Sequence, residues 1–225
     1  MKSLINFIKL FTGLFLYAVG IVITINANNG LAPWDIFHQG LALQMHITMG
    51  QAGIGVGFIL IVINFIFGER IGLGTIGNMF FVGYFLDILI ANHWIPVIEE
   101  GLFLQFAMMS LGLFIIGVAS VFYIGTGLGA GPRDGLMVIL TKKTGKSVQF
   151  VRNAIEVVVL IFGFFLGGSL GLGTVYMSLS VGFFVQLAFK IFHFNVNTVQ
   201  HRFIDEDIRW LKYKLLALKK KKSYD

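Results

Sequence analysis

Six long apolar segments limit what this chain can fold into. A helix needs about 20 mostly apolar residues to cross the hydrocarbon core of a bilayer. Six stretches meet that requirement: residues 5–25, 50–67, 74–91, 102–124, 148–166 and 172–191. Only 12% of the 225 residues are charged, whereas a soluble domain has about 25%. We therefore predict an all-α membrane protein with six transmembrane helices.

The residue types that are missing exclude several kinds of chemistry. The chain has no cysteine, which excludes disulfides, thiol catalysis and thiolate metal sites. No Ser/His/Asp set has the spacing of a hydrolase. The best metal candidate, Asp35 with His38 and His46, is too loosely spaced to indicate a site. We expect no enzyme activity, no cofactor, no metal and no nucleic-acid partner.

Positive charge predicts how the chain crosses the membrane. With six spans, the N-terminus, residues 68–73, residues 125–147 and the C-terminal tail share one side, which carries the lysines and arginines that lie outside the spans. The opposite side has none of them and carries Asp35, Glu99 and Glu100. By the positive-inside rule we expect both termini to be cytoplasmic.

The sequence repeats itself at an offset of 99 residues. Gly13-Leu14-Phe15 recurs as Gly112-Leu113-Phe114, and Gly72-Leu73-Gly74-Thr75 recurs as Gly171-Leu172-Gly173-Thr174. We predict one repeat over residues 1–100, a second over 101–192, and a separate tail over 193–225. Each repeat has three spans, an odd number, so the second must be inverted. Inverted repeats are typical of secondary transporters.

A short helix is predicted between the first two spans of each repeat. Pro33-Trp34-Asp35 recurs as Pro132-Arg133-Asp134. Proline and an acid suit the first turn of a helix, where backbone N–H groups lack partners and the dipole is positive. The expected helices, within residues 33–43 and 132–142, are about 8–10 residues long and too short to span the membrane. We expect them to be re-entrant or to lie at the membrane surface.

The chain resembles a known family through these motifs. Gly129-Ala130-Gly131-Pro132-Arg133-Asp134-Gly135-Leu136, Pro33-Trp34-Asp35 and the paired Gly-Leu-Gly-Thr motifs are similar to those of YczE/YyaS/YitT-type bacterial membrane proteins. The resemblance covers about residues 10–190. It implies a small bacterial inner-membrane protein with several spans, and no particular chemistry.

The glycine-rich turns and the helix starts that follow them are the candidate substrate site. Arg133 is the sharpest candidate, because a guanidinium beside free N–H groups at a helix start suits a carboxylate or phosphate. The alternative is that Arg133 pairs with Asp134 or extends to the lipid headgroups. The predicted substrate-binding residues are Pro33, Trp34, Asp35, Gly129, Gly131, Pro132, Arg133 and Asp134.

Two acids fall inside predicted spans. A charge at membrane depth is costly, so it is a candidate for proton or cation coupling. Glu156 lies near the middle of its span, and Arg152, one turn earlier, is within reach of a salt bridge. Asp87 lies nearer a span end. The structural alternative is that Arg152 and Glu156 fix a helix end and that Asp87 reaches interfacial water.

The tail and the helix faces predict other contacts. Residues 203–222 place apolar side chains at helical spacing among many lysines, as in an amphipathic helix on an anionic lipid surface. Glycine-rich faces such as 53–57 and 163–167 favour close helix packing within the chain, with a homodimer contact as the alternative.

Together these features predict a small secondary transporter or exporter of an unidentified, anionic small molecule, with proton coupling through Glu156. Two other classes stay open. One is a substrate-binding membrane subunit of an ATP-driven importer, which would need ATPase partners. The other is a scaffold or assembly factor, for which the basic tail would matter while Glu156 and Arg133 tolerate substitution.

Overall fold

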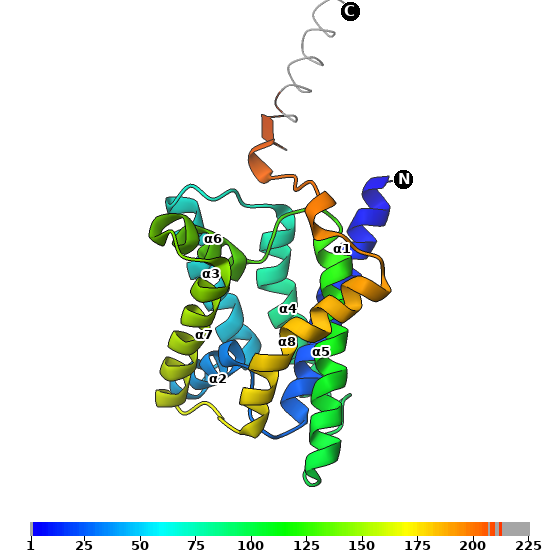
Figure 1. Cartoon of the computed structure of the whole chain (residues 1–225), viewed down its shortest axis with the longest axis vertical. Helices are drawn as coiled ribbons and strands as arrows, with labels where there is room; N and C mark the ends of the chain where they lie inside the picture. Colours follow the sequence, from blue (N-terminus) through cyan, green and yellow to red (C-terminus); the bar gives the residue numbers. More distant parts are fainter. Residues whose placement is uncertain (1, 207, 210–211, 213–225) are drawn as a thin grey trace, which may run out of the picture.

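The computed structural model consists of helices and the turns that connect them in the residues that it describes, which are 2–206, 208–209 and 212 (Figure 1). Its elements are α1 (Lys2–Asn26), α2 (Pro33–Met45), α3 (Met49–Ile66), α4 (Leu73–Ala91), α5 (Leu102–Ile124), α6 (Pro132–Thr144), α7 (Val148–Phe165), α8 (Leu172–Ile191) and a short 3-10 turn, Val196–Thr198. Most of the predicted amphipathic tail helix lies outside the described residues.

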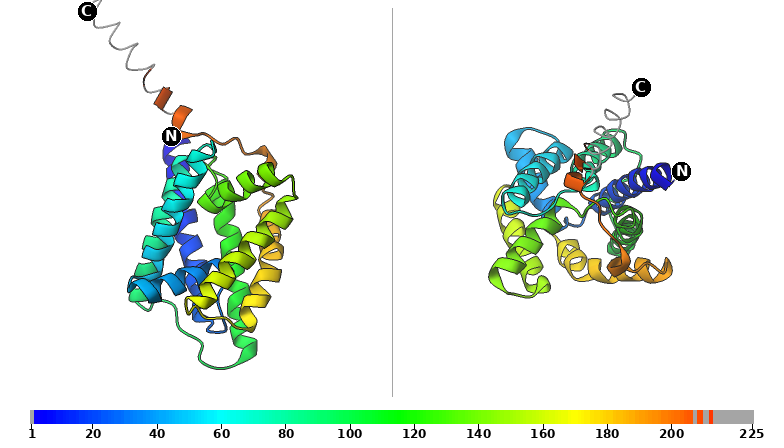
Figure 2. Two further views of the ribbon diagram at one scale, coloured as in Figure 1. Left: turned by 90° about the vertical axis from the view of Figure 1, so that its left-hand side faces the viewer. Right: turned by 90° about the horizontal axis from the view of Figure 1, so that it is seen from above.

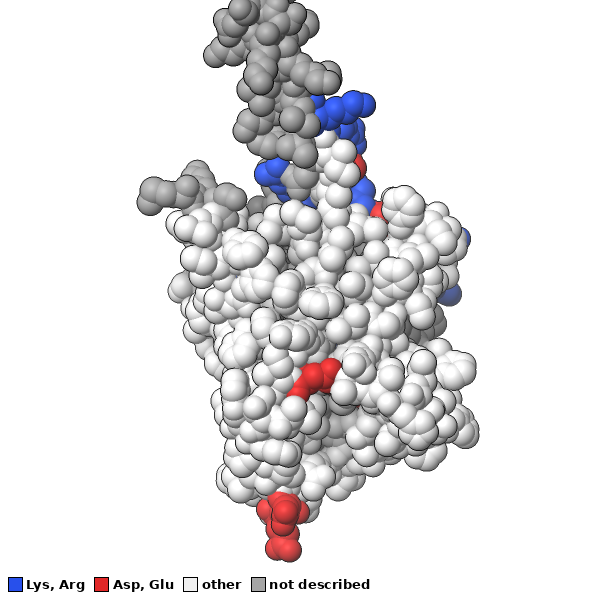
Figure 3. Space-filling view, turned by 180° about the vertical axis from the view of Figure 1, so that it is seen from behind, with Lys and Arg blue, Asp and Glu red and all other residues white. Residues whose placement is uncertain are grey.

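Six of the helices are long and apolar enough to cross a membrane. They are α1, α3, α4, α5, α7 and α8. The membrane spans within them agree with the predicted spans to within one residue at each end. Between its basic and acidic ends the surface is almost uncharged, with one acidic patch on the face shown in Figure 3. The chain is therefore a multi-pass membrane protein.

The two short helices are longer than the sequence predicted. Both α2 and α6 have 13 residues, and each starts at its proline, as expected. They run past residues 43 and 142 because their ends are set by left-handed residues. His46 (φ 54°) and Gly145 (φ 65°) each turn the chain out of the helix and donate a backbone N–H to the last turn.

The long helices α1 and α5 pack closely side by side in the bundle (Figure 2). Glycines allow this close approach: a Cβ on Gly20 would lie 2.8 Å from the Gly112 carbonyl oxygen. Leu14, Ala18 and Met109 are fully buried around this contact. Helix α4 packs on α1, while α8 packs on α5.

Each short helix packs on a long helix from the other half of the chain. Helix α2 lies against α7, and α6 lies against α3. A Cβ on Gly163 of α7 would lie 2.5 Å from the Phe37 nitrogen of α2. On the other side, the buried Asn64 of α3 donates to the Pro132 carbonyl of α6 at 2.8 Å. The two halves are therefore interlocked.

Backbone hydrogen bonds join the turn before each short helix to the start of a long helix in the other half. The Gly74 N–H donates to the Leu128 carbonyl at 2.7 Å, and the Gly173 N–H donates to the Asn29 carbonyl at 2.8 Å. The two bonds are related by the 99-residue offset. The Gly-Leu-Gly-Thr motifs therefore serve to admit a neighbouring backbone at contact distance.

Replacing Gly72 by alanine should destabilise this junction. Its Cβ would collide with the Leu128 carbonyl oxygen, and overpacking of this kind costs about 1–3 kcal/mol. Gly55→Ala is the matched control, because a Cβ there meets no described atom within 4 Å. Denaturant unfolding of both variants in mild detergent measures the difference. Equal stability of the two variants would contradict the role given to the Gly72 contact.

Candidate functional site

A cavity of about 250 Å³ lies between the two halves, and residues from α1 through α8 line it. Its apolar lining comes mainly from side chains of α3, α4 and α8. Its polar lining comes from several helices, and part of it from the starts of α2 and α6. The polar lining residues are Tyr17, Asp35, His38, Asn78, Ser120, Tyr123, Arg133, Asp134 and Arg152.

The starts of α2 and α6 meet at this cavity. The Arg133 guanidinium lies over the Trp34 ring, 4.6 Å from its centroid. Trp34 and Arg133 are 99 positions apart, so equivalent residues of the two Pro-x-Asp motifs touch. A cation on an indole face is attracted by the ring quadrupole. This contact holds the guanidinium at the cavity without neutralising its charge.

The two aspartates of these motifs have different surroundings. The Asp134 carboxylate accepts the Gly131 N–H at 3.1 Å and so caps its own helix. Asp35 makes no such cap. It is buried beside the His38 imidazole, with 3.9 Å between Oδ1 and Nδ1, and burial lowers the pKa of that imidazole well below its usual value, so His38 is a neutral neighbour. Among the described residues, the Asp35 carboxylate has no hydrogen-bond donor, so it is available to a ligand.

Two buried polar atoms at the cavity have no partner. His38 and Tyr123 are both lining residues, only 5% and 3% exposed. Within the described chain, neither His38 Nε2 nor the Tyr123 hydroxyl makes a hydrogen bond. Buried polar groups are normally satisfied. These two atoms therefore indicate where a ligand or water would bind.

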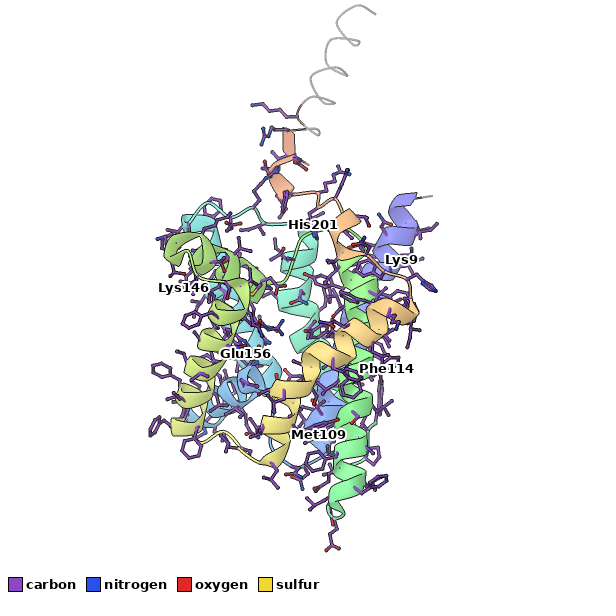
Figure 4. All side chains as sticks on the ribbon, viewed as in Figure 1. Lys9, Met109, Phe114, Lys146, Glu156 and His201 are labelled. Carbon is purple, nitrogen blue, oxygen red and sulfur yellow. The ribbon has the colours of Figure 1, made fainter. Side chains whose placement is uncertain are left out.

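The predicted Arg152–Glu156 salt bridge is confirmed, with 3.0 Å between Nε and Oε1. Arg152 lines the cavity, and Glu156 follows it by one turn of α7 at about mid-height of the molecule (Figure 4). The pair thus places a carboxylate of low exposure next to the cavity wall. Coupling through Glu156 stays a prediction.

The structure gives Asp87 a structural position. Its carboxylate accepts the Gly50 N–H at 2.8 Å and the Thr48 hydroxyl at 2.5 Å. It thereby caps α3 and ties α3 to α4. Asp87 is not among the residues that line the cavity, so its coupling role, still untested, gains no support from the geometry.

The other predicted residues divide into lining and supporting positions. Gly131 and Pro132 line the cavity. Trp34 supports Arg133, and Pro33 is buried at the start of α2.

Gly129 (φ +108°) packs against Gly72 and Thr75 of the other half. Its backbone conformation favours glycine, which explains the residue type.

Sequence reasoning missed several lining residues. Tyr17, Ser120 and Tyr123 lie within apolar spans, far from the motifs that drew attention. Their equivalents 99 positions away are Ile116, Ile21 and Thr24, so the repeat gave no signal. His38 was considered only for a metal. No cluster of three metal-ligating side chains exists in the described part of the chain, and His38 serves the cavity instead.

Comparison with known proteins gives the family. Residues 4–190 match the model of a family of unknown function, DUF6198. The chain belongs to this family. It is 35% identical to the uncharacterized membrane protein YczE of Bacillus subtilis over 182 residues, which cover 79% of this chain and 82% of YczE. The expected resemblance is therefore confirmed.

Two further relatives give the same result. An uncharacterized protein of Haemophilus influenzae is 33% identical over 162 residues, 72% of this chain and 73% of that protein. The uncharacterized protein YyaS of Bacillus subtilis is 26% identical over 169 residues, 72% and 81% of the two chains. No solved structure matches the chain significantly.

In this member of the DUF6198 family, the segment after α8 returns to the glycine turn that precedes α6. The Arg202 N–H donates to the Gly127 carbonyl at 2.6 Å, and the Ile204 N–H donates to the Ile71 carbonyl at 3.0 Å. The Arg70 guanidinium then bonds Asp205 at 2.9 Å and Glu206 at 2.7 Å. These hydrogen bonds lower the pKa of both carboxyl groups below their usual values.

Acidification should release this segment. The two carboxyl groups bind Arg70 at pH values above their lowered pKa values. They lose it as they become protonated, below about pH 4. Hydrogen exchange at the Arg202 and Ile204 amides, corrected for the intrinsic effect of pH, should then accelerate. Arg70→Ala should give fast exchange already at pH 7, while Lys146→Ala, at an exposed residue, should not. Unchanged exchange in Arg70→Ala would refute this account.

Proposed function

We propose that this protein is a small secondary transporter, not an enzyme, which moves a small molecule bearing an anionic group. The observation that carries the proposal is the cavity enclosed by both halves of the chain and lined by the starts of both short helices. Transporters with broken or short helices bind substrates at such helix starts, between two halves of the molecule.

The second support is the regularity of the architecture. Helices α2, α3 and α4 begin at residues 33, 49 and 73, and α6, α7 and α8 begin at 132, 148 and 172, each 99 positions later. The hydrogen bonds at Gly74 and Gly173 follow the same relation. These equivalences favour two inverted repeats. Charge distribution favours cytoplasmic termini in a bacterial inner membrane, with the basic tail on anionic lipid.

The third support is a difference between equivalent helix pairs. Helices α3 and α4 are in close contact: a Cβ on Gly83 would lie 2.6 Å from the Gly50 carbonyl oxygen. The equivalent helices α7 and α8 are not packed in this way within the described residues. A Cβ on Gly182, the equivalent of Gly83, would meet no described atom within 4 Å. Gly182 is thus free to receive α7.

This asymmetry is what two exchangeable states would produce. In the present state Asp87 holds Thr48 and Gly50, so the α3–α4 pair is closed. In the other state Gln186 would approach Ser147 and bring α7 and α8 together while the first pair opens. This second contact would be wider than the first, because Gln149 stands where Gly50 admits no Cβ. Exchange between these states would expose the central cavity alternately to the two sides.

Within the cavity, Arg133 would bind the anionic group and Glu156 would couple proton movement. Arg133 has no acid within 4 Å among the described residues and is held by an aromatic ring. Protonation of Glu156 would release Arg152, which lines the same cavity as Arg133. Proton binding would thereby change the charges that the substrate meets. This coupling gives the function a direct genetic test.

Metabolites should redistribute between cells and medium when the protein is overproduced. Arg133→Ala and Glu156→Gln should abolish the redistribution, whereas Glu99→Gln, in an exposed loop, should preserve it. Mass spectrometry of cell extracts and media makes the comparison. If no compound moves with the wild type, the transporter proposal fails. Co-purified ATPase partners would then favour the importer subunit, and dependence on the tail alone would favour a scaffold.

A cross-link should detect the second state. Ser147→Cys with Gln186→Cys should form a disulfide only when α7 and α8 close, in a chain that otherwise has no cysteine. Adding Asp87→Asn weakens charge-assisted hydrogen bonds worth about 1.5–3 kcal/mol, so cross-linking should accelerate about tenfold or more. Adding Glu99→Gln is the control. No acceleration with Asp87→Asn would contradict exchange between the two helix pairs.

A further inference from the structure

Two opposite charges at the cavity remain without an ionic partner close enough to neutralise them. Asp134 is used in capping α6, and Arg152 is used in binding Glu156. Asp35 and Arg133 are left. In the described chain they form no salt bridge with each other, since no pair of their charged atoms lies within 4 Å. The site therefore presents a separated cation and anion.

The Arg133 and Asp35 side chains each lie beside an aromatic ring. Arg133 is held over the Trp34 ring at 4.6 Å, and both sit on the first turns of the two short helices. Asp35 is buried beside His38. A buried charge without a partner is unfavourable, so a ligand that brings a positive group to the buried Asp35 would relieve that cost, while the half-buried Arg133 can bind the opposite charge of the same ligand.

The unpartnered atoms extend the same pattern. His38 Nε2 and the Tyr123 hydroxyl are buried, line the cavity and lack hydrogen-bond partners in the described structure. They add polar contacts around the two charges. Aliphatic side chains also line the cavity, with Val82, Leu86 and Val181 among them. The cavity thus combines charged, polar and aliphatic lining residues.

Resting on the proposed transport function, we propose that the substrate is a zwitterion with a small aliphatic body, of the amino-acid type. Its carboxylate binds Arg133, its ammonium group binds Asp35, and its side chain packs on the aliphatic lining residues. A simple anion would lie near the unneutralised Asp35, and a simple cation would lie near Arg133. Only a ligand with both charges neutralises both residues.

Three probes with related carbon skeletons test the substrate class. L-valine has both charges, isovalerate lacks the ammonium group, and isobutylamine lacks the carboxylate. Calorimetry on the purified full-length protein in detergent should show that valine binds at least about tenfold more tightly than either analogue, because a site built for a polar group rejects ligands that lack it. Proteoliposomes should take up labelled valine in preference to isovalerate.

Two substitutions test the assigned roles. Asp35→Asn should bring valine and isovalerate to within about twofold of each other, and Arg133→Gln should do the same for valine and isobutylamine. Glu99→Gln should keep the preferences. Melting temperatures of all variants check that they fold, and the comparison of analogues on the wild type needs no variant.

Each failure has a distinct meaning. Equal binding of isovalerate and valine by the wild type overturns the zwitterion inference, while uptake of isovalerate would leave transport of an anion standing. If none of the three probes binds, the inference is overturned as well. The transport proposal itself then depends on whether other metabolites redistribute in cells.

Discussion

The structure depends on the need to satisfy backbone polar groups where the chain is not helical. In the membrane interior an unpaired N–H or C=O group costs several kcal/mol, so irregular backbone survives only when it is buried in protein. The turns before α2 and α6 meet this requirement by bonding the starts of α8 and α4, through Asn29 to Gly173 and Leu128 to Gly74. Each turn is thus completed by the other half of the chain, which explains why the halves interlock.

Glycine makes this exchange possible and also limits it. Gly30 and Gly129 have φ values of +92° and +108°, and a Cβ on either would lie within 2.7 Å of a threonine hydroxyl oxygen of the opposite half. Such contacts fix the depth of the short helices relative to the long ones. The proposed exchange between states would therefore occur at helix pairs held by side chains, and the Asp87 contact to Thr48 and Gly50 is one such place.

The sequence predicted well whatever depends on local pattern. Apolar length located the six spans, Pro-x-Asp located the starts of α2 and α6, and helical spacing predicted the Arg152–Glu156 pair. It predicted poorly whatever depends on three-dimensional packing. The short helices end at Met45 and Thr144, just before the left-handed residues His46 and Gly145, and the predicted ends at residues 43 and 142 fell two residues short. Tyr17 and Tyr123 reach the cavity because of how α1 and α5 cross, which their apolar surroundings do not reveal.

The places where the two halves differ carry the functional argument. Equivalent positions hold Trp34 and Arg133, so a ring in one half supports a charge in the other. The equivalent aspartates have divided their tasks, because Asp134 caps α6 whereas Asp35 faces the cavity without a donor. A symmetric pair of caps would have left the cavity without an anionic group on the α2 side. Because α2 has no such cap, the Asp35 carboxylate and the Arg133 guanidinium both line the cavity. The proposed site for a molecule that carries both charges rests on that difference.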